Sequence, residues 1–458
     1  MSGPSDADSW MQRAAALLGE QRMIEADAAV AEARALVPHD PRIAFLHAQS
    51  RFELGHPAAA LFAAAQRLWP ANPDVLRNHA LALAAEDDFP AAEALLADAL
   101  GASPGWLDGH RILAGLRWTH GDDGDFDASY AAAVAAQPRS TAVWLGWFSA
   151  VAQHRDWPRA SALLDRADAA LGDPAATRAA RAFVAVESGD EAAARPLLAT
   201  LADRSDDFTN LCRIRFHLRA REFALAEVAA LAMTRGTGAG QAWPYLSAIW
   251  RSTGDARAAW LDGDPLYASE MTVNLSAADM SELAATLRSL HRAQRPYAEQ
   301  SVRGGTQTDR SVLLRHEPIV QRTRAALMQA VRDYVAALPP PDPSHPLLGR
   351  SREQRRIAGS WSVRLSQGGH NVAHSHPMGW ISSAFYVALP ETAERGAAPA
   401  GHLLLGAPPP ELGLDLAPYR TIAPEVGKLV LFPATLWHGT QAYPAGERLN
   451  IAFDIIPG

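Results

Sequence analysis

The sequence has few or none of several features that would define its class. It has one cysteine in 458 residues, Cys212, so neither an intramolecular disulfide nor a thiolate zinc cluster can form. No apolar run approaches the ~18 residues needed to span a bilayer, and the N-terminus has no basic start followed by an apolar stretch. The formal net charge of −8 argues against a nucleic-acid protein held by a basic face. We therefore expect a soluble cytoplasmic protein that binds neither nucleic acid nor membranes.

Prolines recur at a regular interval through the first half of the chain. They stand 32, 34, 34 and 36 residues apart, at Pro38, Pro70, Pro104, Pro138 and Pro174. The segments between them are rich in alanine and leucine, as in "DDFPAAEALLADALGASP", and proline cannot continue a helix. This period resembles that of tetratricopeptide repeats over residues 8 to 262. The resemblance implies an α-solenoid that presents a concave surface to a peptide or protein, with an ordinary all-α domain as the alternative.

The character of the sequence changes near residue 263. We predict helical repeats over residues 1–262 and a second domain over residues 263–458. The second domain opens with two amphipathic helices, of which the first follows a plausible N-cap at Ser276 and the second is stopped by "PPPDPSHP". From Ile357 onward the runs are short and many alternate with period two: "SWSVRLS", "WISSAFYVALP", "GHLLLG", "YRTIAP", "GKLVLFP" and "RLNIAFDIIP". Such runs predict a β-sandwich or barrel.

Polar residues stand at the ends of these predicted strands. His374 and His376 fall at the start of one strand, in "NVAHSHPMGWISSAFYV", and His438 falls just after "KLVLFPATLW". Neutral imidazoles bind iron, zinc or copper, so these three could hold a metal on one face and leave the other open. Arg448, ten residues after His438, could bind a carboxylate through two charge-assisted hydrogen bonds. A surface ion pair with Glu447 or a neighbouring residue is the alternative for Arg448.

The order of these residues resembles the Fe(II)/2-oxoglutarate-dependent oxygenases, and more narrowly the branch fused behind tetratricopeptide repeats. The stretches that carry the resemblance are "SVRGGTQT", "SWSVRLSQGGHNVAHSHPMGWISSAFYVALP" and "LFPATLWHGT…ERLNIAFD". The resemblance implies a double-stranded β-helix (jelly-roll) with flanking helices, with His374 and His438 as iron ligands. It further implies that Arg448 binds the distal carboxylate of 2-oxoglutarate, assisted by Asn450 and Tyr386. For Tyr386 a role as a core aromatic is equally open.

His376 departs from the family pattern, which has an aspartate or glutamate at this position. It could be the third ligand of a three-histidine site, or it could lie outside the ligand set while water or a distant carboxylate completes the site. A domain that has lost its metal is the remaining possibility. His370 is a competing ligand, and His402 is expected at the strand surface or in a pocket.

We therefore predict an oxidoreductase, a 2-oxoglutarate-dependent dioxygenase with Fe(II) at His374, His376 and His438 and 2-oxoglutarate as co-substrate. No catalytic side chain beyond the metal ligands is predicted. The repeats point to a protein or peptide side chain as the substrate to be hydroxylated. The alternatives are a non-catalytic repeat scaffold with a degenerate β-domain, and a three-histidine metal dioxygenase that does not use 2-oxoglutarate. The substrate, the reaction outcome and the oligomeric state stay open.

Overall fold

The computed structural model describes residues 6–121 and 124–458, which form two compact units. One unit takes in the described residues up to Asp173 together with Leu313–Gln321. The other comprises Pro174–Val312 and Arg322–Gly458. The predicted domain boundary near residue 263 marks the end of the repeat pattern and differs from the division into compact units. This boundary stays a prediction. In the described part of the chain, no helix is long and apolar enough to cross a membrane.

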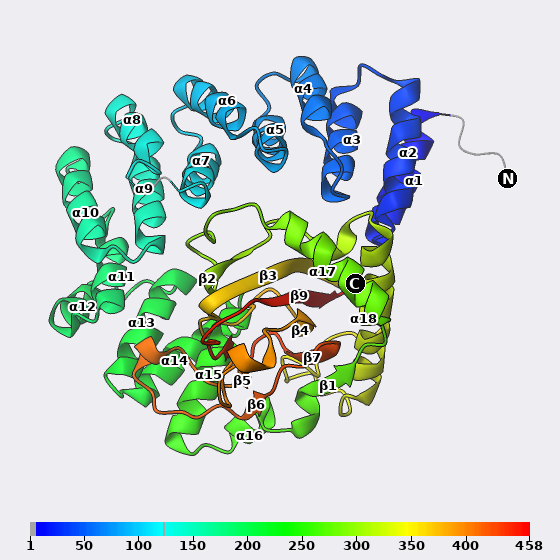
Figure 1. The fold of residues 1–458 in the computed structure, drawn as a ribbon. Helices are drawn as coiled ribbons and strands as arrows, with labels where there is room; N and C mark the ends of the chain where they lie inside the picture. Colours follow the sequence, from blue (N-terminus) through cyan, green and yellow to red (C-terminus); the bar gives the residue numbers. More distant parts are fainter. Residues whose placement is uncertain (1–5, 122–123) are drawn as a thin grey trace. The chain divides into compact units, whose positions relative to one another are not determined.

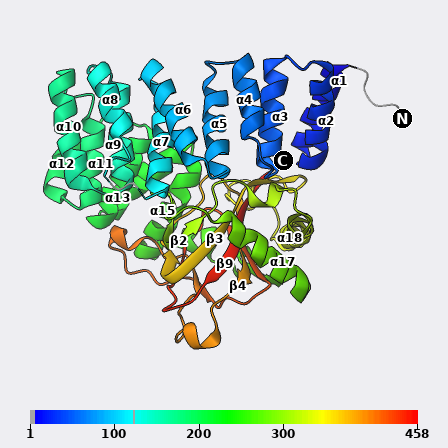
Figure 2. The same cartoon turned by 45° about the horizontal axis from the view of Figure 1, so that its top comes forward.

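Antiparallel helix pairs follow one another along the first 262 residues, and those of the first unit stand side by side in Figures 1 and 2. The helices of the first unit are α1 (Ala7–Gly19), α2 (Met23–Leu36), α3 (Pro41–Glu53), α4 (Ala59–Leu68), α5 (Pro73–Ala85), α6 (Phe89–Ala102), α7 (Leu107–Thr119), α8 (Ala128–Ala136), α9 (Thr141–Gln153) and α10 (Trp157–Leu171). The second unit continues with α11 (Arg178–Ser188), α12 (Glu191–Ala199), α13 (Asp207–Arg219), α14 (Phe223–Met233), α15 (Ala239–Thr253) and α16 (Arg257–Asp262). The predicted α-solenoid of tetratricopeptide-like repeats is confirmed.

The turn inside each helix pair shows the repeat more regularly than the prolines do. In every described pair, one residue just after the first helix has a positive φ: Gln21, Gly55, Asp87, Gly121, Arg155, Gly189, Arg221 and Gly254. These positions are 32 to 34 residues apart and continue through residue 254, so the pattern spans both units. Glycine adopts this left-handed conformation without cost, whereas the four other residues are less favourable there. The prolines have the expected place, since Pro38 and Pro104 directly follow the residues that end α2 and α6.

Two antiparallel sheets form the C-terminal β-domain. The larger sheet has the strand order β1-β7-β4-β9-β3-β2 and the smaller has β6-β5-β8. The strands are β1 (Ser269–Thr272), β2 (Val302–Gln307), β3 (Arg355–Asn371), β4 (Ile381–Ala388), β5 (Leu403–Leu405), β6 (Arg420–Ile422), β7 (Lys428–Pro433), β8 (His438–Thr440) and β9 (Arg448–Pro457). Apolar side chains from both sheets, among them Phe432, Leu403 and Val430, meet in one buried cluster. The predicted double-stranded β-helix is confirmed, and the six predicted strand runs correspond to β3, β4, β5, β6, β7 and β9.

The two predicted flanking helices are α17 (Ala277–Leu290) and α18 (Pro318–Ala337). Ser276 caps α17 as expected, because its hydroxyl accepts a hydrogen bond from the backbone N–H of Asp279. Leu283 and Leu287 on α17 are fully buried, and α17 contacts β4. Strands β1, β2 and β8 were not predicted, because their runs of three to six residues are short and two of them contain glycine.

His291, directly after α17, ties this helix to the larger sheet. Its two ring nitrogens lie 2.8 Å from Oγ1 of Thr306 on β2 and 2.9 Å from Oγ of Ser362 on β3. Burial, with a smaller contribution from Arg364, lowers the pKa of His291 to about 4. The unfolded chain therefore binds a proton below pH 6.5 that the folded protein does not bind until about pH 4, so stability falls as the pH drops through this window.

We expect His291→Gln to be less destabilising at pH 5 than at pH 7. The difference in unfolding free energy between wild type and variant should shrink by up to ~1.4 kcal/mol per pH unit below pH 6.5, because glutamine does not titrate. Urea denaturation at several pH values measures this difference. A difference that does not change with pH would show that His291 is not held neutral.

Candidate metal centre

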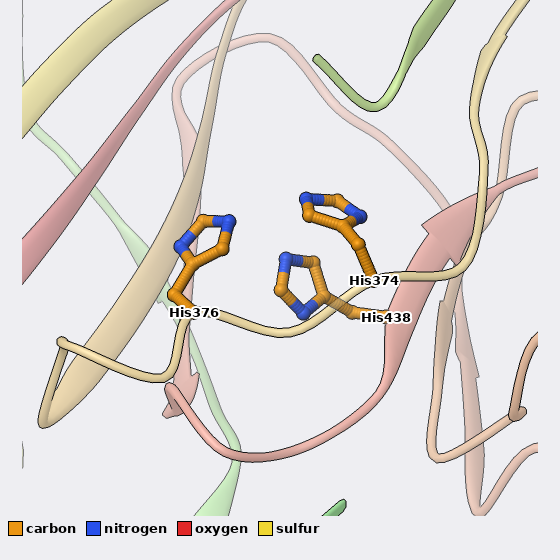
Figure 3. Close-up of side chains that lie close together, drawn as sticks. All are labelled: His374, His376 and His438. Carbon is orange, nitrogen blue, oxygen red and sulfur yellow. The ribbon is translucent and has the colours of Figure 1, made fainter. Parts of the chain in front are cut away.

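Three histidine side chains converge in the β-domain. Potential ligand atoms of His374, His376 and His438 all lie within 4.8 Å of one another, and Figure 3 shows the three rings facing a common centre. His438 is buried, while His374 and His376 are partly buried. Among the described residues, this is the one group of three or more histidine, cysteine or carboxylate side chains with such spacing.

The local backbone differs from the prediction around these histidines. His374 and His376 lie in the connection between β3, which ends at Asn371, and β4, and not at the start of a strand. His438 does not follow a long strand but is the first residue of β8, because β7 ends at Pro433. The backbones of His374 and His438 exchange two hydrogen bonds of 2.9 Å, so the connection is fixed against β8. His376 N–H donates to the carbonyl of Ala434 at 2.8 Å.

Each of the three rings has a partner at Nδ1. His374 Nδ1 lies 2.8 Å from the carbonyl of Val372, and His438 Nδ1 lies 3.0 Å from that of Leu436. These carbonyls can only accept, so both Nδ1 atoms carry the proton and Nε2 is left as the metal-binding nitrogen. His376 Nδ1 instead lies 2.7 Å from a carboxylate oxygen of Asp454.

Burial keeps the imidazoles of His374 and His438 neutral. Burial lowers the pKa of His374 to about 3, and the neighbouring His376 lowers it further. Burial also lowers the pKa of His438 well below its usual value, assisted by the two other histidines. A neutral imidazole with its Nδ1 proton engaged is the form that binds a divalent transition metal. The three side chains therefore fit an Fe(II) ion, although imidazole donors suit zinc, copper and nickel as well.

Strand β9 brings a second set of polar groups to the domain. Arg448, Asn450 and Asp454 occupy alternate positions, so their side chains lie on one face of the strand. Tyr386 on β4 is directly opposite Asn450 in the sheet register. The guanidinium carbon of Arg448 lies 5.0 Å from the ring centroid of Tyr386. The side chains predicted to bind the co-substrate, Arg448, Tyr386 and Asn450, are thus brought together in the β-domain.

Arg448 is a buried cation without a buried anion. It is 2% exposed, its one described hydrogen bond is a long one (3.3 Å) to the carbonyl of Gly401, and no described carboxylate forms an ion pair with it. Glu447 pairs instead with Arg288 and Arg364, so the predicted alternative of a surface ion pair between Arg448 and Glu447 is wrong. A buried charge is costly unless it is paired, so the site fits an anionic ligand.

Further buried polar atoms near Arg448 have no hydrogen-bond partner in the described structure. They are Tyr386 Oη, Tyr443 Oη, Asn450 Oδ1, His402 Nδ1 and Arg448 Nε. Burial raises the pKa of Tyr386 and of Tyr443, so both hydroxyls stay protonated and can donate. Buried polar groups are rarely left unsatisfied. The two hydroxyls and the Arg448 guanidinium can donate to a carboxylate such as the distal one of 2-oxoglutarate, whereas Asn450 Oδ1 can only accept.

Sequence reasoning missed two of the residues near these groups. Tyr443 lies in the loop between β8 and β9, where no strand pattern marks it. Asp454 could have been found from its period-two spacing to Arg448 in "RLNIAFD". His370, the competing ligand, pairs with Arg303 on the β2–β3 ladder and is not part of the histidine cluster. His402 lies beside Gly401 with a buried Nδ1, in agreement with a pocket position.

Helix α15 packs against Trp437, the residue directly before β8. The indole N–H of Trp437 donates to the carbonyl of Pro244 at 2.9 Å, and the ring meets Tyr245 edge to face at 5.4 Å. Arg251 donates to the carbonyls of Gly406 and Ala417. A buried apolar cluster joins α13, α14 and α15 to Trp437 and Leu412. The last repeat-like helices and the β-domain therefore share one core.

Comparison with known proteins agrees with this architecture. Residues 359–454 match the family model described as "Putative 2OG-Fe(II) oxygenase". This region is thus similar to the oxygenase family that the resemblance predicted, and tetratricopeptide-like repeats precede it in the chain. The family is one of oxidoreductases and implies Fe(II) and 2-oxoglutarate. No curated protein matches the chain.

Several solved structures have local similarity to the chain. A Pseudomonas putida prolyl-4-hydroxylase is 18% identical over 42% of this chain and 93% of its own, with a TM-score of 0.29. HygX from Streptomyces hygroscopicus, with nickel and 2-oxoglutarate bound, is 13% identical over 42% of this chain and 83% of its own, with a TM-score of 0.31. A tetratricopeptide repeat protein from Parabacteroides merdae is 12% identical over 50% of this chain and 91% of its own, with a TM-score of 0.32.

Proposed function

We propose that the protein is an Fe(II)/2-oxoglutarate-dependent oxygenase that hydroxylates a side chain of a protein or peptide recruited by its helical repeats. In this proposal His374, His376 and His438 hold the iron, and Arg448 binds the distal carboxylate of 2-oxoglutarate. The observation that carries the proposal is the buried Arg448, which has no carboxylate partner among the described residues of a domain that also gathers three imidazoles.

The side chains of the site have separate tasks in this proposal. When bound, iron and 2-oxoglutarate supply the oxidising chemistry, which consumes dioxygen, releases succinate and carbon dioxide, and leaves one oxygen atom on the substrate. Arg448 neutralises the distal carboxylate and fixes the orientation of the co-substrate. Tyr386 and Tyr443 can donate hydrogen bonds to the same carboxylate, and the amide of Asn450 can assist Arg448. The buried apolar cluster that contains Tyr386 and Phe432 would limit the access of water to the bound carboxylate.

The helical repeats support a macromolecular substrate. Arrays of paired helices present extended surfaces that bind peptides or proteins. Here the last repeat-like helices share a core with Trp437, the residue directly before His438, so a partner held on α13–α15 would be near the β-domain. The assignment of a protein or peptide substrate rests on this combination of domains.

We expect the purified protein, given Fe(II), 2-oxoglutarate and air, to form succinate slowly even without its substrate. His438→Ala should lower succinate formation at least ~100-fold, because it removes a ligand and leaves an incomplete site. His370→Ala is the matched control, since His370 lies outside the cluster, and should keep the wild-type rate. Succinate is measured by chromatography, and bound iron is measured in parallel.

The outcomes separate the proposal from its alternatives. Equal succinate formation by wild type and His438→Ala would contradict the proposed site. A wild-type protein that binds neither iron nor 2-oxoglutarate would favour the non-catalytic scaffold. Bound iron in a protein with no affinity for 2-oxoglutarate would favour a three-histidine dioxygenase of another kind.

A further inference from the structure

The three candidate ligands differ in what holds their Nδ1 atoms. His374 and His438 are held by neutral backbone carbonyls, whereas His376 is held by the carboxylate of Asp454 at 2.7 Å. His376 is also the ligand that stands where the related oxygenases have a carboxylate. Position 376 therefore lacks the negative charge of a carboxylate ligand, but the Asp454 carboxylate places a negative charge one hydrogen bond away from it.

The carboxylate of Asp454 has one described ion-pair partner, the imidazole of His376. Asp454 lies on β9 and is 8% exposed. No described arginine or lysine lies within ion-pair distance of it. Gly379 packs on it closely enough that an added Cβ would lie 3.3 Å from the Asp454 carboxyl carbon. The backbone of Gly379 therefore lies close to one side of this carboxyl group.

A carboxylate that accepts the Nδ1 proton of a metal-binding histidine has two effects. It fixes the ring and its tautomer, and it makes Nε2 more basic and gives the ring partial imidazolate character. The hydroxyl of Ser382 is the other group near this nitrogen, at 3.0 Å, and it carries no charge. The effect of charge should therefore come from Asp454 and not from Ser382.

We propose that Asp454 is a positioning residue that acts through His376 and supplies the negative charge that a three-histidine site lacks. The inference rests on the proposed function, because it requires that His376 binds the metal. It means that the site resembles a two-histidine, one-carboxylate site in total charge while presenting three nitrogen donors. The ligand that His376 and Asp454 would serve in this way is a divalent transition metal ion.

The test is Asp454→Asn, which keeps an oxygen for the His376 hydrogen bond and removes the charge. Anaerobic titration of the full-length protein with Fe(II), and with Co(II) as a spectroscopic probe, should show metal affinity 10- to 100-fold weaker than in wild type. The charge-transfer absorption of the Fe(II)–2-oxoglutarate complex should shift, and the midpoint potential of bound iron should rise, because the oxidised ion loses a stabilising negative charge. A purely structural role for Asp454 would move neither spectrum nor potential.

Ser382→Ala is the matched comparison and should weaken metal binding less than threefold. Thermal unfolding of the metal-free variants shows that each is folded. If His438→Ala abolishes metal binding but Asp454→Asn leaves affinity, spectrum and potential unchanged, this inference is wrong and the proposed metal centre stands. If His438→Ala leaves metal affinity unchanged, the proposed function itself fails.

Discussion

Arg448→Gln is expected to weaken 2-oxoglutarate binding about 30-fold to several thousand-fold. Truncating one member of a buried, hydrogen-bonded charge pair costs roughly 2 to 5 kcal/mol, and ~1.4 kcal/mol is a factor of ten in affinity. Arg448 is 2% exposed, so bulk water cannot replace the lost interaction. Glutamine preserves much of the length of the side chain while removing its charge. The dissociation constant is measured by anaerobic calorimetry on the metal-loaded protein.

Arg364→Gln provides the matched control for this experiment. Arg364 is on β3, directly before Leu365, which lies opposite Arg448 in the sheet. The side chain of Arg364 is 41% exposed and forms an ion pair with Glu447. Exposed ion pairs contribute little, so the control should change 2-oxoglutarate affinity less than twofold. If Arg448→Gln keeps the wild-type affinity for 2-oxoglutarate, the buried guanidinium has another task. Full oxygenase activity of the variant without 2-oxoglutarate would favour a three-histidine dioxygenase that does not use this co-substrate.

Local patterns in the sequence were sufficient for most of the fold. The proline period predicted the helix pairs, because each repeat follows the same local rules for capping and turning. Period-two alternation predicted β3, β4 and β9, because buried strands present alternate side chains to different environments. His374, His438 and Arg448 could be singled out because they follow one another in the order typical of one family.

Contacts between distant segments could not be predicted in the same way. Asp454 lies 78 residues from His376, and their hydrogen bond depends on the register of β9 in the larger sheet. Trp437 and Pro244 are 193 residues apart, and no local pattern marks them as partners. The polar groups of Tyr386, His402, Tyr443 and Asn450 near Arg448 likewise come from separate loops and strands. Such contacts follow from tertiary packing, which a single sequence does not display.

The packing of Trp437 against α15 leads to a second large expected effect, on stability. Trp437 is 7% exposed and belongs to the cluster that joins α13, α14 and α15 to the β-domain. Trp437→Ala would leave a cavity in this cluster and remove the hydrogen bond to the carbonyl of Pro244. Removing a buried tryptophan costs about 3 to 5 kcal/mol, and we expect a loss of unfolding free energy in this range. Urea denaturation followed by circular dichroism measures it.

Two further variants separate packing from hydrogen bonding at this position. Trp437→Phe keeps most of the apolar contact with Tyr245 and loses the indole N–H, so it should cost only about 1 to 2 kcal/mol. Trp69→Ala is the control, because that tryptophan is 38% exposed and belongs to the other unit, and it should cost less than about 1 kcal/mol. Because His438 follows Trp437 directly, Trp437→Ala should also weaken metal binding, whereas Trp69→Ala should not. Equal unfolding free energies for Trp437→Ala and Trp69→Ala would show that the packing of Trp437 on α15 does not stabilise the β-domain. The contact between α15 and the segment that carries His438 would then contribute nothing to stability.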